Sequence, residues 1–291
     1  MPDSPDDRNA VALELPRPFS GRLPWLRGEK RAAARALWRW HHALTDPRAP
    51  RLDGDDLTAY FEAERQKAAA RDPLEVVPED VWRAAYDASD AHDLPEALLA
   101  RQIGAARRFE RERIRFPERT DLDAWLKTWA LPHALLLAKL AGAGHSWQER
   151  PIFELARGFF LTNRLLRLPR DLRADRLFFP ETDLDQYDVS PETLREGPPG
   201  EGQSPAENVQ RFLWKLSVRA RDALAQGQEA LGGELPRRYA WALRCYWLGA
   251  LDLLDQLDSR DHDLWHASPP GLPWWRRSQV YLQAFLGRSG R

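Results

Sequence analysis

The sequence predicts an all-α protein with a single domain. Apolar residues recur at the spacing of a helix face along most of the 291 residues, which is the main signal for helical structure. No segment combines apolar–polar alternation with the turn residues of a hairpin. No repeat with a period of about 20–50 residues indicates a solenoid. Together these observations favour one bundle of helices, because a chain of this length can bury a sizeable core.

Start and stop signals divide the chain into separate helices. The first should stop at Asp46-Pro47, since proline lacks the N–H that a helix interior needs. Asp55 or Asp56 caps the second helix, and Pro78 suits the first turn of the third. In chain order, we expect helices over residues 30–44, 55–71, 78 onward, 95–113, 121–141, 152 to about 167, 208–231 and 235–257.

Composition and charge exclude several classes of protein. Hydrophobic residues make up 43% and charged residues 30% of the chain, as is usual for a soluble globular protein. The formal net charge of −1 provides no basic field for nucleic acid. Cys245 is the single cysteine, which excludes an internal disulfide and a cysteine-based zinc site.

Boundaries follow from local composition. We expect residues 1–17 to be disordered, residues 18–291 to form the all-α domain, and Glu196–Ala206, rich in Gly, Pro and Ser, to be a flexible surface loop. The polar start of the chain lacks the features of a secretory signal, and no apolar run reaches the roughly 18 residues of a membrane span. These features predict a cytoplasmic protein with at most a peripheral membrane contact.

One segment carries a family resemblance. Leu161–Ser190 reads LTNRLLRLPRDLRADRLFFPETDLDQYDVS. It resembles the second signature of the squalene/phytoene synthase family in its Thr-Asn pair, in the spacing to Arg176–Pro180, and in its Val-Ser turn. Weaker similarities, in the same order as in the family, occur at residues 19–40, 115–125 and 218–221. The resemblance spans roughly residues 19–260. It implies the isoprenoid-synthase fold, a helical bundle around a central cavity with the 30–44 and 152–167 helices facing each other.

The resemblance also implies a chemistry, namely head-to-head condensation of prenyl diphosphates. Family enzymes neutralise the departing diphosphate with Mg²⁺ held between two D-x-x-x-D motifs on facing helices. Residues i and i+4 share one helix face, so both carboxylates of a motif point the same way. Mg²⁺ prefers such hard oxygen ligands together with phosphate oxygens.

Both acidic motifs are degenerate in this chain. At the first, the two acids align with Thr45 and Ala49, or with Asp46 and Pro50 after a one-residue shift. Pro47 also breaks the helix there. At the second, the acids align with Arg167 and Asp171, with Pro169 between them. Asp46 and Asp171 are therefore the remnants of the catalytic acids, and we expect no metal site and no cofactor, with Mg²⁺ needed only if the enzyme is active after all.

Arginines take the place of the missing acids. Arg167 should pair with Asp171 one helical turn later, and Pro169 should kink the helix or end it early. Arginine grips phosphate without a metal, which makes Asn163, Arg167, Arg170 and Arg176 the candidate substrate-binding residues for an isoprenoid diphosphate or lipid. The alternative is a set of ordinary surface arginines.

Other candidate groups have simpler explanations. His262 and His266 have the i, i+4 spacing of zinc ligands but no evident third ligand, and the adjacent His41 and His42 diverge on a helix. His133 is expected to be a hydrogen-bonded core histidine. The acids Asp87, Asp90 and Asp93 are expected to cap helices in contact with solvent. Two groups have two explanations each. Four tryptophans either pack in the core or line an apolar tunnel (Trp38, Trp40, Trp125, Trp129), and the aromatic, basic stretch 272–277 either touches a bilayer interface or docks on the core.

Three functions are left open. The first is a catalytically degenerate homologue, a pseudoenzyme that binds an isoprenoid or lipid or assists assembly with a protein partner. The family includes one such case, an assembly factor for mitochondrial respiratory complex I. The second is an active head-to-head prenyltransferase on farnesyl or geranylgeranyl diphosphate in squalene, hopanoid or carotenoid biosynthesis. The third is an unrelated helical bundle. The loss of the acidic pairs favours the first.

Overall fold

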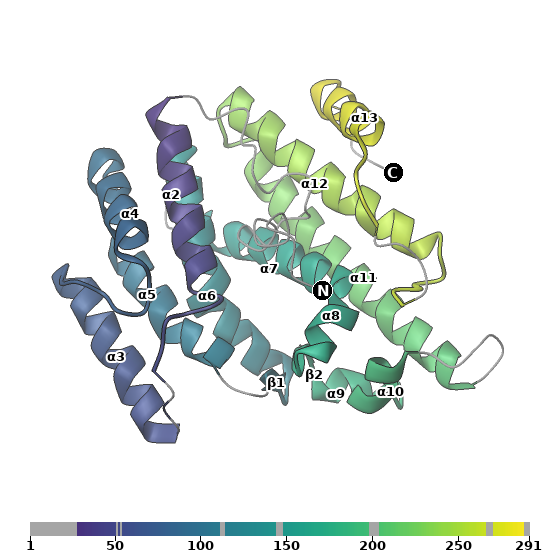
Figure 1. Ribbon diagram of the computed structural model, residues 1–291. Helices are drawn as coiled ribbons and strands as arrows, with labels where there is room; N and C mark the ends of the chain where they lie inside the picture. The colour runs from purple at the N-terminus through teal and green to yellow at the C-terminus, as the bar shows by residue number, and fades with distance from the viewer. Residues whose placement is uncertain are drawn as a thin grey trace.

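The computed structural model describes residues 28–287, apart from residues 51, 53, 111–113, 144–147, 198–203 and 266–269. Helices make up nearly all of the regular structure in this part of the chain (Figure 1). The α-helices are α2 (Glu29–Ala43), α3 (Gly54–Ala70), α4 (Glu79–His92), α5 (Ala97–Ala106), α6 (Arg119–Leu140), α7 (Glu149–Leu166), α8 (Leu168–Arg173), α9 (Glu181–Asp185), α10 (Pro191–Glu196), α11 (Ser204–Gly232), α12 (Arg237–Asp258) and α13 (Trp274–Phe285).

The predicted long helices all exist, with ends that differ by a few residues. The largest difference concerns the helix expected over residues 95–113. There α5 ends at Ala106, and a 3-10 helix, η1 (Arg107–Glu110), follows it. The expected disordered start, residues 1–17, and most of the expected loop at 196–206 lie outside the described residues.

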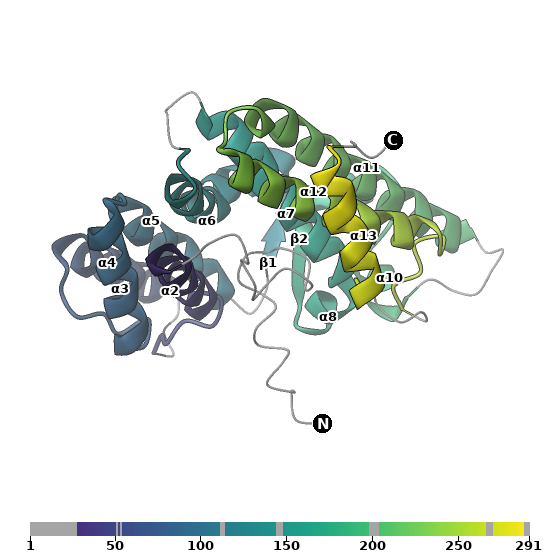
Figure 2. The same cartoon turned by 90° about the horizontal axis from the view of Figure 1, so that it is seen from above.

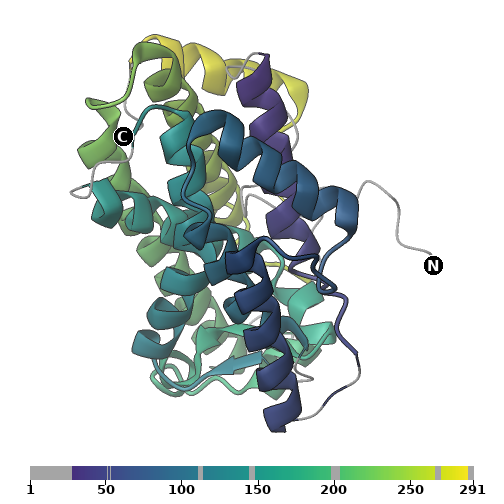
Figure 3. The same cartoon turned by 90° about the vertical axis from the view of Figure 1, so that its left-hand side faces the viewer.

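Helices α6 and α7 form the middle of the bundle. Helix α6 packs against α2 and α5 on one side and against α7 on the other, and α7 packs along α11. Figure 1 shows α2–α5 on one flank and α11–α13 on the other. Seen from the flank of α3 and α4, these two helices and α5 lie in front of the rest of the bundle (Figure 3). The 30–44 and 152–167 helices thus both pack against α6.

Two glycines allow α7 and α11 to approach closely. A Cβ atom on Gly158 of α7 would come within 2.7 Å of the Leu224 side chain, and one on Gly227 of α11 would come within 2.5 Å of the Leu155 side chain. Real Cβ atoms do not make contacts this short, so both positions require a residue without a Cβ atom, which is glycine. This close packing holds α7 firmly along its length and positions its C-terminal end.

A small sheet was not predicted. Strands β1 (Ile114–Phe116) and β2 (Arg176–Pro180) pair in parallel, with Ile114 opposite Arg176 and Phe116 opposite Pro180 and an irregularity between them. Strands of three and five residues are too short to show alternation. They pair because the bundle brings together segments about 60 residues apart, and β2 follows α8 directly. The fold remains all-α, and the sheet places Arg176 beside η1.

Candidate functional site

The first degenerate motif lies just beyond the end of α2. Helix α2 ends at Ala43, and the backbone N–H of Asp46 donates to the Ala43 carbonyl in a turn. The Thr45 hydroxyl donates to the His42 carbonyl at 2.8 Å. Asp46 is exposed and Pro47 is buried. As expected from Pro47, no helix continues through this segment, so positions 46 and 50 do not share a helix face. Position 50 is itself a proline, so Asp46 has no second carboxylate of the motif beside it.

A carboxylate that sequence reasoning missed lies near Asp46. Burial raises the pKa of Glu110 in η1, the negative charge of Asp46 raises it further, and Arg176 lowers it. These effects place Asp46 and Arg176 each within electrostatic range of Glu110. Glu110 was hidden within a segment expected to be plain helix, and no local signal marked it. Arg176 also donates to the Phe109 carbonyl at 3.4 Å.

The second degenerate motif lies at a break between two helices. Helix α7 ends at Leu166, Arg167 adopts a non-helical conformation with φ −108° and ψ 4°, and α8 begins at Leu168. Pro169 is the second residue of α8, a position where a missing N–H costs nothing. The expected interruption at Pro169 is confirmed, and it takes the form of a new helix.

The ion pair of Asp171 differs from the expected one. Nη1 of Arg164 donates to Oδ2 of Asp171 at 3.3 Å, with the side chains 4% and 9% exposed. The guanidinium of Arg164 also lies 4.1 Å from the ring centre of Phe178. The predicted partner was Arg167, one turn before Asp171 in a continuous helix. Because the chain turns at Arg167, α8 instead brings Asp171 back to Arg164, seven residues earlier.

The other predicted ligand-binding residues lie around this junction. Asn163 is buried in the last turn of α7, and its Nδ2 has no hydrogen-bond partner among the described residues. Arg167 and Arg170 are half-buried at the break and in α8. Arg176 is half-buried at the start of β2, 5.9 Å over the Phe109 ring. The structure therefore gathers Asn163 and the arginines at one end of α7, with Arg176 beside η1.

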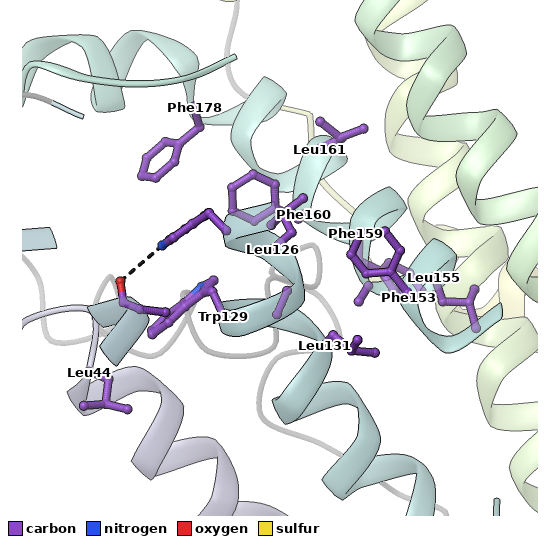
Figure 4. Packing of buried hydrophobic residues seen from close by; sticks show 14 of the residues in the cluster. Leu44, Leu126, Trp129, Leu131, Phe153, Leu155, Phe159, Phe160, Leu161 and Phe178 are labelled. Carbon is purple, nitrogen blue, oxygen red and sulfur yellow. Dashed lines mark hydrogen bonds between the residues drawn. The ribbon is translucent and has the colours of Figure 1, made fainter. Parts of the chain in front are cut away.

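A cluster of aromatic rings lies between α2 and α7. The centre of the Trp129 ring on α6 lies 4.2 Å from the ring centre of His41 of α2 and 5.9 Å from that of Trp125, on which it stacks. The ring centres of Trp125 and Phe160 of α7 lie 5.7 Å apart. Figure 4 shows Trp129, Phe160 and Phe178 directed toward one another. Trp125 also donates to the Ala105 carbonyl at 3.1 Å. Trp40, Trp125 and Trp129 are buried, so the core explanation holds for these three; Trp38 is half-buried.

Two buried histidines accompany these rings. His41 and His133 stack with ring centres 4.3 Å apart, and Nδ1 of His41 lies 2.7 Å from Oε1 of Gln102. The Gln102 amide nitrogen donates to the Leu98 carbonyl, so its oxygen faces His41 and Nδ1 of His41 donates. Neither ring nitrogen of His133 has a hydrogen-bond partner among the described residues. The expected hydrogen-bonded core histidine is therefore not observed at this position.

Burial keeps both histidines neutral. It lowers the pKa of His41 to about 3, and the hydrogen bond that His41 donates to Gln102 opposes this in part. It lowers the pKa of His133 well below its ordinary value, and the neighbouring His41 adds to this effect. The positive charge of Arg164 contributes to the lowering at His41. The last turns of α2 and α7 are therefore within electrostatic range of each other.

The donor set does not fit a magnesium cluster. Within the described ranges, no group of three or more His, Cys, Asp or Glu side chains is placed to hold a metal ion. Asp171 already forms an ion pair with Arg164, and Arg176 lies within electrostatic range of Glu110. His262 lies 3.0 Å from Asp258, and its expected companion His266 falls outside the described residues.

Comparison with solved structures defines the class of fold. The chain resembles squalene synthase HpnC from Alicyclobacillus acidocaldarius with a TM-score of 0.66 and 20% identity, over 88% of this chain and 89% of that one. It resembles a dehydrosqualene synthase with a TM-score of 0.74 and 15% identity, over 97% of each chain. It resembles YisP from Bacillus subtilis subsp. subtilis strain 168 with a TM-score of 0.58 and 13% identity, over 97% of this chain and 100% of that one. The fold is the all-α isoprenoid-synthase fold.

The family follows from the sequence match. Residues 21–280 match the squalene/phytoene synthase family, and the chain belongs to it. No sequence among the curated proteins matches the chain. The third function left open above, an unrelated helical bundle, is thereby excluded.

Proposed function

We propose that this chain is a member of the squalene/phytoene synthase family that has abandoned magnesium-dependent condensation. In its place, the junction between α7 and α8 binds the phosphate end of an isoprenoid diphosphate or lipid without metal. The observation that carries this proposal is the buried ion pair of Arg164 and Asp171.

The ion pair makes Asp171 a poor magnesium ligand. To coordinate a cation, the carboxylate would have to leave Arg164, and a buried guanidinium deprived of its partner costs several kcal/mol, about 3–5 in comparable cases. A divalent cation beside Asp171 would also be repelled by Arg164, since charges interact strongly where water is excluded. The pair thus favours the metal-free state of this end of the site.

The surrounding residues favour an anion. Asn163 presents a buried amide nitrogen that lacks a hydrogen-bond partner among the described residues, and buried donors are normally satisfied. Arg167 and Arg170 lie at the same junction, and guanidinium groups bind phosphate oxygens in a bidentate manner. A diphosphate or a phosphorylated headgroup has the oxygens that such a set would bind.

The catalytic half of the proposal is tested with purified full-length protein. Incubation with farnesyl or geranylgeranyl diphosphate and millimolar magnesium should yield no squalene or phytoene above a no-protein control. Magnesium-dependent product formation at about one turnover per second or faster contradicts the proposal and establishes the active prenyltransferase instead.

The binding half is tested by calorimetry in the presence of EDTA. Farnesyl diphosphate, inorganic pyrophosphate and phosphatidic acid in detergent micelles distinguish a prenyl diphosphate, the bare diphosphate and a lipid headgroup. Arg170→Gln should weaken binding about tenfold, the loss of roughly one charge-assisted contact. Arg101→Gln, which removes an exposed arginine of α5, is the matched control and should bind as wild type does. Failure of all three probes to bind the wild-type protein rejects a metal-free anion site.

A further inference from the structure

Helix α13 has apolar residues on two opposite faces. Val280 and Ala284 are buried, 3% and 1% exposed, where α13 packs on α12. Five large apolar side chains are exposed instead: Trp274 at 78%, Phe285 at 77%, Leu282 at 58%, Leu286 at 55% and Trp275 at 49%. At about 100° per residue, these five lie within one arc of about 120°, on the side away from Val280 and Ala284.

The inner face fixes the helix to the bundle. Arg276 forms an ion pair with Asp252 of α12 at 2.6 Å, and Arg244 of α12 donates to the Ala284 carbonyl at 3.2 Å. The rings of Trp241 and Tyr281 lie 5.9 Å apart. Viewed from above, α13 lies along the outer side of α12 (Figure 2). Because the inner face is already packed, the outer apolar face is presented as a rigid surface at the edge of the molecule.

The charge of this end of the chain differs from that of the remainder. Residues 264–291 contain four arginines, Arg276, Arg277, Arg288 and Arg291, and no aspartate, glutamate or lysine, which gives +4. The whole chain has a formal net charge of −1, so residues 1–263 carry −5. A segment that combines exposed Trp, Phe and Leu with a local excess of arginine suits the boundary between an anionic headgroup layer and the acyl chains.

We propose that the outer face of α13 docks on the surface of an anionic lipid bilayer. Trp274 and Phe285 enter the headgroup region, and the arginines of residues 264–291 other than Arg276, which is paired with Asp252, attract acidic headgroups. The contact is peripheral, because none of the helices in the described part of the chain is long and apolar enough to cross a membrane. This inference does not depend on which ligand binds at the α7–α8 junction.

A second copy of the chain is a less suitable occupant for this face. Pairing two α13 helices through their outer faces would bring together two segments that contain arginines and no acids, and like charges at short range repel. A bilayer with acidic lipids offers the opposite charge and also covers the apolar side chains. Each buried side chain of this size contributes roughly 1.5–3 kcal/mol when fully removed from water, so two or three partly inserted residues suffice for reversible binding.

Sedimentation with lipid vesicles tests the proposal on the full-length chain. Wild-type protein should sediment with vesicles of phosphatidylcholine and phosphatidylglycerol, but weakly with phosphatidylcholine alone, and the binding should fall as salt is raised. The double variant Trp274→Ser/Phe285→Ser should bind at least about tenfold more weakly. Both residues are highly exposed, so the variant should keep its helical circular dichroism and its melting temperature.

A matched control uses another exposed tryptophan. Trp214 on α11 is 52% exposed, and Trp214→Ser should leave vesicle binding unchanged. Three results overturn the proposal: no wild-type binding to anionic vesicles, equal binding by the double variant, or the same loss from Trp214→Ser. A concentration-dependent dimer in light scattering that disappears in the double variant also overturns it, because the face would then serve a second copy.

Discussion

The two degenerate motifs differ in the surroundings of the acid that each retains. At the first, α2 ends at Ala43, shortly before Pro47, and Asp46 is exposed in a turn. At the second, Pro169 begins a new helix and Asp171 stays buried beside Arg164. The acid at the first end faces solvent, whereas the acid at the second end is paired with an arginine. An exposed acid constrains little, but a buried acid with a fixed partner cannot move away without leaving a buried charge uncompensated.

The largest expected effect tests this contrast in stability. Arg164→Leu leaves the buried Asp171 carboxylate without its guanidinium and should lower the free energy of unfolding by about 3–5 kcal/mol. Asp46→Asn, at the exposed end, should change it by less than about 0.5 kcal/mol. Urea unfolding at pH 7 measures both. The double variant Arg164→Met/Asp171→Leu should recover most of the loss, and similar effects of Arg164→Leu and Asp46→Asn would contradict the contrast.

The second prediction concerns pH at the α2 end, where His41 and His133 are buried neutral. Both have a folded-state pKa below the unfolded value of about 6.5, so the unfolded chain binds more protons once the pH falls below 6.5. Their stabilising contribution is complete above about pH 6.5 and is lost as the pH falls toward 3. Each histidine gives a slope of up to about 1.4 kcal/mol per pH unit.

From pH 7 to pH 5, the free energy of unfolding should therefore fall by about 2–4 kcal/mol from these two groups. Urea unfolding at both pH values measures the difference. His133→Leu removes one of the two groups, and its stability should change by about half as much over the same range. An equal pH dependence in wild type and His133→Leu would show that the buried histidines are not responsible.

The smallest expected effect concerns Arg167. Arg167→Asp places a second carboxylate near Asp171. It should lower the free energy of unfolding by roughly 1–3 kcal/mol and therefore lower the melting temperature. Millimolar magnesium should recover part of this loss by binding the folded variant and should leave wild type unchanged. Thermal melts with and without magnesium make the comparison, and Arg167→Gln controls for loss of the arginine alone. An equal gain from magnesium in wild type and in Arg167→Asp would mean that the site still accepts the metal.

Much of the fold was predictable because its signals are local. Apolar periodicity located the long helices, and Pro47 and Pro169 marked both helix ends at the site. The Thr-Asn pair at residues 162–163 and the run to Pro180 indicated the family that the match over residues 21–280 shows. These features depend on residues within a few positions of one another, which is the range over which backbone preferences act.

Other parts of the site depended on contacts between distant segments. Glu110 approaches Asp46, and β1 pairs with β2, only after the bundle has formed. The stack of His41, Trp129 and His133 joins two helices, and no spacing rule predicts that His133 is buried without a hydrogen-bond partner among the described residues. Burial and long-range charge set these properties, and neither is visible in a local pattern.

The sequence by itself determined the all-α fold, the family and the loss of the acidic pairs, because helix periodicity, motif spacing and residue identity can be observed along the chain. The tertiary structure decided which arginine neutralises Asp171. A continuous helix would pair it with Arg167, but the turn at Arg167 directs α8 back so that Arg164 is the partner. The direction of a chain after a helix break depends on what it packs against, here Leu168 and Leu172 in the core, and that packing exists only in the folded protein.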